Sequence, residues 1–175
     1  MKSKLTTMLL IIILIIGVGL IFVNPIQNKL IALNSQALLQ EEIIVADTVK
    51  EASFDFNEVQ SINFADVLEA QLSKKHFAVI GAIAIPSVDL ELPIGKGVSE
   101  AVILYGAGTM KPDQQLGQGN YALASHYIEG KDILFGPLYN VELGDAILIS
   151  DASHLYEYTI TVKEVILDTD VQVIY

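Results

Sequence analysis

The sequence of 175 residues contains no cysteine and no arginine, and all ten of its basic residues are lysine. Without cysteine, these residues form no disulfide, no thiolate metal site and no thiolate nucleophile. Few basic residues against 21 acidic ones give a net charge of −11. Nucleic-acid binding requires a basic face, so we expect no nucleic-acid partner.

Charge is also missing from a long hydrophobic run near the N-terminus, Leu5–Asn28, which follows Lys2 and Lys4. Its apolar core, Leu5–Val23, would span about 28 Å as a helix, close to the ~30 Å hydrocarbon layer. A cleaved signal peptide would have a shorter apolar region and a small-residue cleavage site, which is missing here. We therefore predict that residues 1–28 form an uncleaved membrane anchor. The lysines favour a cytoplasmic N-terminus and an extracellular domain.

Residues 29–76 are predicted to form a stalk and an N-terminal helix. A helical spacing of apolar residues leads into the stalk: Ile26, Leu30, Leu33 and Ala37. A further helix is expected to begin near Asn63. Asn63 can cap it, and Asp66 stands at the third helical position, as in a capping box. Its apolar residues are Val67, Leu68, Ala70 and Leu72.

From Phe77 onward the pattern changes to short apolar or alternating segments, which predict strands. They cover residues 78–85, 89–94, 121–126, 145–150 and 155–167. Val98–Tyr105 is predicted as a short helix, and the glycine-rich segment Gly106–Gly119 as a loop or a set of turns. Several short strands at close spacing indicate a mainly β domain, a barrel or sandwich, over residues 77–175.

Three histidines are candidates for chemistry, namely His76, His126 and His154. Their wide spacing does not suggest a zinc site, and we expect no cofactor. His76 is interpreted as a helix-terminal cation and His154 as a residue of an exposed turn. His126 ends an apolar strand, where catalytic groups are often held, although periodicity alone fits a structural histidine as well. Ser125 should point to the opposite face of that strand, which argues against a Ser-His pair.

Four segments together carry a family resemblance: Val79–Pro86, Leu92–Gly97, Leu104–Met110 and Asn120–His126. In their residues, order and spacing they resemble class A sortases, the cysteine transpeptidases of Gram-positive cell surfaces. The resemblance extends from Val79 to Val173. It implies an eight-stranded β-barrel, of which about six strands are present here, preceded by the transmembrane helix and short helices.

The resemblance also implies a reaction. In this family a cysteine thiolate attacks the Thr–Gly bond of an LPxTG-type sorting signal, and an amine of a cell-wall precursor releases the acyl-enzyme. His126 matches the family's general acid/base. The family's cysteine and arginine have no match in residues 1–175. We therefore expect a sortase truncated after about six strands and inactive as it stands. Two alternatives remain: a non-catalytic, membrane-anchored extracellular binding module, and an unrelated anchored β-domain with a chance histidine.

Overall fold

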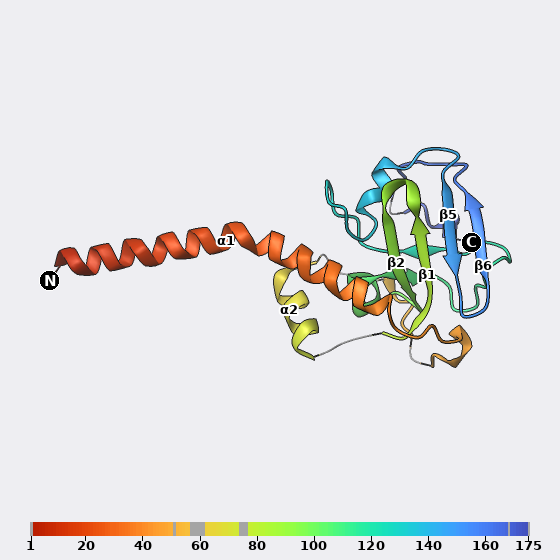
Figure 1. Ribbon diagram of the computed structural model, residues 1–175, viewed down its shortest axis with the longest axis horizontal. Coiled ribbons are helices and arrows are strands. Elements are labelled where there is room, and N and C mark those ends of the chain that lie inside the picture. Colours follow the sequence, from red (N-terminus) through yellow and green to blue (C-terminus); the bar gives the residue numbers. More distant parts are fainter. Residues whose placement is uncertain (1, 51, 57–61, 74–76, 168, 175) are drawn as a thin grey trace.

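The computed structural model describes residues 2–50, 52–56, 62–73, 77–167 and 169–174 (Figure 1). Three α-helices are present in this part of the chain: α1 (Lys2–Leu38), α2 (Phe64–Ser73) and α3 (Glu100–Tyr105). The strands are β1 (Val79–Ile85), β2 (Leu90–Gly95), β3 (Ala107–Thr109), β4 (Leu123–Ala124), β5 (Ala146–Ser150) and β6 (Leu155–Thr159). Short 3-10 helices lie at Ala46–Thr48, Pro86–Val88, Gly136–Asn140 and Val171–Ile174.

The six strands form one curled sheet in the order β4-β3-β2-β1-β5-β6. Neighbouring strands are antiparallel, except that β3 runs parallel to β2. The sheet is a half-barrel whose two edges, β4 and β6, each pair on one side only. This arrangement confirms the predicted mainly β fold of about six strands with short helices.

The central hairpin, β1 and β2, follows directly from the sequence. Pro86 ends β1 because it has no backbone N–H to donate, and Asp89, with φ of 50°, completes the turn. The alternating residues of β2, Leu90, Leu92 and Ile94, are all buried in the core. The alternation therefore predicted this buried face correctly, and on the other face Pro93 and Gly95 are buried as well.

Strand β3 corrects the prediction that the whole glycine-rich segment Gly106–Gly119 is a loop or a set of turns. Ala107–Thr109 instead pairs with β2 on one side and β4 on the other. The glycine in the middle of β3 is required by packing, since a Cβ on Gly108 would lie 2.2 Å from the carbonyl oxygen of Gly97. Glycine therefore marks a close backbone approach here, not a turn.

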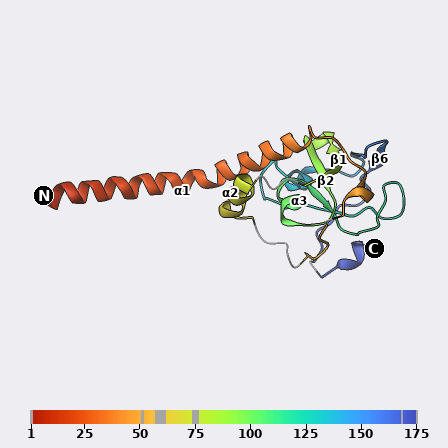
Figure 2. The ribbon, with the colours of Figure 1, turned by 90° about the horizontal axis from the view of Figure 1, so that it is seen from below.

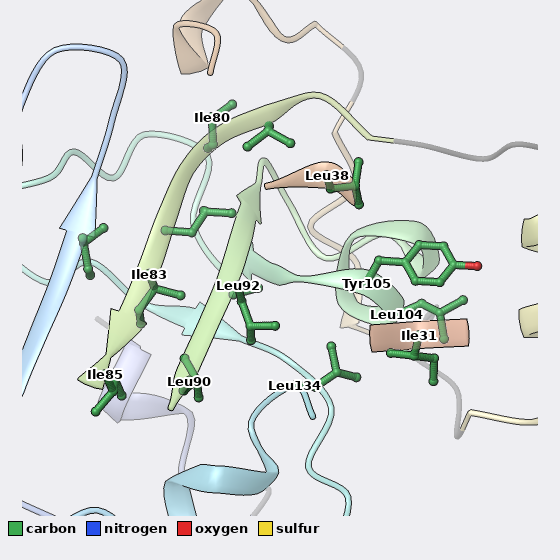
Figure 3. Packing of buried hydrophobic residues seen from close by; sticks show 14 of the residues in the cluster. Ile31, Leu38, Ile80, Ile83, Ile85, Leu90, Leu92, Leu104, Tyr105 and Leu134 are labelled. Atoms are coloured by element: carbon green, nitrogen blue, oxygen red, sulfur yellow. The ribbon is translucent and has the colours of Figure 1, made fainter. Parts of the chain in front are cut away.

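Helix α1 continues without interruption past Asn28 and packs its C-terminal third on the domain (Figures 1 and 2). The buried face consists of Gln27, Ile31, Ser35 and Leu38. Figure 3 shows Ile31 and Leu38 close to the core residues of β2 and α3. The predicted stripe was wrong at Ile26, Leu33 and Ala37, which are exposed. A polar residue, Ser35, occupies the interface because its hydroxyl has a buried partner, the carbonyl oxygen of Tyr105.

Helix α2 begins as the sequence predicts. The Asn63 Oδ1 accepts hydrogen bonds from the backbone N–H groups of Ala65 and Asp66, at 2.9 and 3.1 Å. The Asp66 carboxylate accepts one from the N–H of Asn63 at 3.2 Å, which completes a capping box. Val67 and Ala70 are buried, whereas Leu68 is exposed, contrary to the predicted stripe. The three residues after α2, including His76, lie outside the described residues.

The last predicted strand, 155–167, is shorter than expected. Strand β6 ends at Thr159, opposite Ala146, where its partner β5 begins. Beyond it, Val162, Val165 and Leu167 are exposed to solvent. Alternation alone could not predict where β6 ends, because a strand also needs a neighbour that supplies backbone hydrogen bonds.

Within the described residues, one helix is long and apolar enough to cross a membrane. It comprises Thr6–Leu38, and its most apolar 18 residues have a mean hydropathy of 3.0. The side chains from Met8 to Phe22 are largely exposed, and this part of α1 extends away from the domain (Figure 2). This helix is therefore a candidate membrane span.

Candidate active site

His126 lies two residues beyond β4, at an edge of the sheet. Strand β4 is held by β3 through the pairs Gly108–Ala124 and Thr109–Leu123. The regular strand is thus shorter than the predicted one, 121–126. His126 is fixed further by its own carbonyl oxygen, which accepts a hydrogen bond of 3.0 Å from the backbone N–H of Phe135. Its backbone is therefore held on two sides while its side chain remains partly accessible.

The hydroxyl of Ser125 has a hydrogen-bond partner other than His126. It donates a hydrogen bond of 2.6 Å to the carbonyl oxygen of Gly106, the residue that joins α3 to β3. Successive side chains point to opposite sides of an extended segment, so Ser125 and His126 diverge. The serine thus helps to attach β4 to its neighbours, and the structure gives no support to a Ser-His pair.

The His126 side chain lines a cavity of about 340 Å³, which we call the His126 cleft. The side of the cleft nearest the sheet comes from the segment after β4, and Ile62 adds an apolar contact. The other side comes from α1. The complete lining is Asn24, Gln27, Asn28, Ile62, His126, Tyr127, Ile128 and Lys131. No carboxylate occurs in this described lining, so the cleft is formed by amides, one cation, one imidazole, one phenol and apolar groups.

Burial removes water from the imidazole and lowers the pKa of His126 from its ordinary value of 6.5. The ring is consequently neutral at pH 7, where one nitrogen can accept a proton and the other can donate one. A neutral imidazole at the mouth of a cleft can act in general acid/base catalysis once a proton donor or acceptor is within reach.

The described histidines are not brought together. His154 lies in the turn between β5 and β6, with its side chain 68% exposed and its Nδ1 3.6 Å from the Asp151 carboxylate. It borders a different cavity, together with Tyr121 and Tyr156. The described residues contain no cluster of metal-ligating side chains. His126 is therefore the candidate for proton transfer, and His154 has the exposed-turn position that the sequence predicted.

Comparison with known proteins assigns the chain to a family. The sortase domain family matches residues 83–175, which include β3, β4 and His126. The chain belongs to the sortase family. It is 42% identical to the sortase A of Listeria monocytogenes over 168 residues, covering 94% of this chain and 76% of the relative. It is 38% identical to the sortase A of Streptococcus agalactiae, covering 95% and 71%. These relatives support class A.

Solved sortase structures share the fold. The structure of Listeria monocytogenes sortase A is 47% identical in the aligned region, with a TM-score of 0.54. The alignment covers 55% of this chain and 67% of that structure. A sortase A from Corynebacterium diphtheriae, at 19% identity and a TM-score of 0.51, shows the same fold. The half-barrel is therefore a sortase fold.

Proposed function

We propose that this sortase is a membrane-anchored cysteine transpeptidase that cleaves LPxTG-type sorting signals and transfers surface proteins to an amine of a cell-wall precursor. One observation carries the proposal. His126 combines the family's histidine segment with a strand-end position, an open cleft and a lowered pKa. These properties suit a group that first takes a proton from a nucleophile and then hands it to a leaving amine.

The nucleophile has to come from outside residues 1–175, because these contain no cysteine. We place it, with the family's arginine, on a segment that adds to the β4 edge, where no strand of the described chain pairs. A thiolate there would attack the carbonyl carbon of the signal's Thr–Gly bond and form a thioester. The bond's nitrogen would leave as an amine, with the proton that the neutral His126 ring had taken from the thiol when the thiolate formed. The acceptor amine would then attack the thioester carbonyl and displace the thiolate, while His126 takes the amine's proton and returns it to the sulfur.

The test is a fusion of residues 1–175 to a sortase-like C-terminal segment that carries a cysteine and an arginine. The fusion should join an LPxTG peptide to an amine acceptor, detected by mass spectrometry. Replacement of a general acid/base costs about 10²–10⁴ in rate, so His126→Gln should lower kcat/KM by that factor. His154→Gln is the matched control and should retain the rate. Full activity of His126→Gln would refute the role of His126.

We also propose that α1 anchors the protein, with its N-terminus in the cytoplasm and the sheet outside, because Lys4 precedes the apolar run. A chain without cysteine is well suited to topology mapping, since one introduced thiol gives an unambiguous signal. Glu129→Cys should react with a membrane-impermeant maleimide on intact cells, and Lys4→Cys should react only after lysis. The reverse pattern would refute the orientation.

A second candidate function is a non-catalytic binding module. It is favoured by the absence of cysteine and arginine in residues 1–175. Under this alternative the cleft would hold a sorting signal without cleaving it. Residues 1–175 alone should then bind an LPxTG peptide, and the fusion described above should remain inactive even though its thiol reacts with a small alkylating agent.

A further inference from the structure

We infer that the anchor helix forms a substrate-binding wall of the His126 cleft, in which the carboxamides of Gln27 and Asn28 bind backbone amide groups of the peptide. The inference rests on the proposed peptide chemistry of this cleft and adds a specific contact to it. It concerns residues that belong to the membrane-anchoring helix and lie outside the region 83–175 that matches the sortase domain.

The geometry brings distant parts of the chain to one cavity. Asn24, Gln27 and Asn28 stand on consecutive turns of α1 and line the same cavity of about 340 Å³ as His126 and Lys131. Within the described chain, no hydrogen bond engages these three carboxamides. They therefore remain available to a ligand beside the imidazole.

This wall is held in a fixed place. One helical turn beyond Gln27, Ile31 is fully buried against the domain, and Leu38 is buried further along the same face (Figure 3). Between them, the Ser35 hydroxyl donates a hydrogen bond of 2.6 Å to the carbonyl oxygen of Tyr105. A continuous helix that is attached at several points cannot move its preceding turn freely. Gln27 and Asn28 are thus preorganised, which lowers the entropic cost of binding.

The chemistry of the wall favours a peptide. A carboxamide offers both donors and an acceptor, as a peptide bond does, so the two form complementary pairs. A phosphate group would need several cations, whereas the described lining contains one, Lys131, with Glu129 and Asp132 as exposed neighbours in sequence. Ile62 and Ile128 provide apolar surface for side chains of a bound peptide.

The position of the wall along α1 sets where the peptide lies. The exposed apolar run ends near Phe22, and Asn28 is six residues further, about 9 Å along a helix. The polar layer of a bilayer is roughly 5–8 Å thick on each side. The cleft therefore opens at the membrane surface, and a lipid headgroup is the occupant that the experiment has to distinguish from a peptide.

The first experiment uses the full chain in lipid nanodiscs, where the absence of native cysteine allows a photo-crosslinker at one introduced thiol. Asn28→Cys and Tyr127→Cys place it on the two sides of the cleft, and Gln36→Cys places it on an exposed position of the same helix. The probe is a labelled LPxTG peptide. We expect peptide adducts from positions 28 and 127 and none from position 36.

Each other outcome has a definite meaning. Adducts from position 127 without adducts from position 28 would overturn the inference and leave the proposed function standing. Lipid adducts from position 28 in place of peptide adducts would also overturn it. The absence of peptide adducts from both cleft positions would count against the inference and the proposed function together.

The second experiment measures the affinity of the same peptide. Gln27→Met keeps the side-chain volume and removes the amide, and Asn28→Ala truncates a half-buried side chain. Losing one or two hydrogen bonds should weaken binding about three- to thirty-fold in the double variant. Gln36→Ala, which removes an exposed carboxamide from α1, should bind as tightly as the parent chain. Equal affinities of the double variant and the parent would overturn the inference.

Discussion

Ser35 and Tyr105 connect helix α1 to the core of the domain. The Ser35 hydroxyl donates a hydrogen bond of 2.6 Å to the carbonyl oxygen of Tyr105, the last residue of α3. Carbonyl groups at the end of a helix have no partner within that helix. A serine on α1 therefore satisfies a buried acceptor that α3 leaves open, and it fixes the orientation of α1 on the sheet.

The first prediction follows from this bond. Ser35→Ala should lower the free energy of unfolding by about 1–3 kcal/mol, because the Tyr105 carbonyl would remain buried without a partner. Denaturant titration in detergent measures the change. Gln36→Ala, at the next and exposed position, should stay within about 0.5 kcal/mol of the parent chain. Equal losses in the two variants would contradict a specific role for Ser35.

The second prediction concerns the close approach of β3 to its neighbour. In Gly108→Ala, the new Cβ would meet the Gly97 carbonyl oxygen at 2.2 Å. A backbone carbonyl moves away less easily than a side chain does. We therefore expect the free energy of unfolding to fall by about 3 kcal/mol, at the upper end for overpacking. The His126 ring resonances should also shift, because Gly108 pairs with Ala124 two residues before it.

Gly119 provides the contrast for this experiment. It has φ of +60° and no atom within 4 Å of a built Cβ. Gly119→Ala should therefore lower the free energy of unfolding by about 1–2 kcal/mol, because alanine disfavours the left-handed conformation. The His126 resonances should not shift. A larger loss for Gly119→Ala than for Gly108→Ala would show that crowding at β3 is relieved in solution.

The third prediction is a pH dependence. Burial lowers the pKa of His126, so the unfolded chain binds more protons than the folded one between that lowered value and 6.5. Stability then rises with pH in this window, and it is lost as pH falls through the folded pKa. NMR titration of the His126 ring should give a midpoint below 6.5. A midpoint at or above 6.5 would contradict the burial of the ring.

His126→Gln should reduce this loss of stability on acidification. His154→Gln is the matched removal of a histidine from an exposed turn, and the difference between the two variants isolates the contribution of His126. Denaturant titrations between pH 5 and 8 would measure it. Identical pH profiles of the two variants would show that His126 has no special part in the acid response.

Local chemistry made much of this fold predictable. The Asn63–Asp66 capping box, the alternation in β2 and the proline that ends β1 each act within a few residues, so the sequence alone was enough. The position of His126 at a strand end could be predicted for the same reason, and the family resemblance singled it out among the histidines.

Tertiary contacts explain the errors. The buried face of α1 includes Ser35, which an apolar stripe cannot reveal, because its partner is the distant Tyr105 carbonyl. Strand β3 was missed because glycines that permit a close approach look like glycines that permit turns. The α1 side of the His126 cleft, with Gln27 and Asn28, had no sequence signal, because two segments far apart in the chain create it.

The last prediction concerns the exposed apolar residues after β6. Val165 is 101% exposed and Leu167 is 70% exposed, in a segment rich in β-branched residues that follows the edge strand β6. Such segments promote self-association. Val165→Lys with Leu167→Lys should reduce association, measured by sedimentation over a range of concentrations, and change the free energy of unfolding by no more than about 0.5 kcal/mol.

The matched control is Ile149→Lys in β5, where the side chain is 6% exposed. It should unfold the sheet, because a charge would be buried without a partner. A large loss of stability in the double variant would show that Val165 and Leu167 pack against the domain in solution.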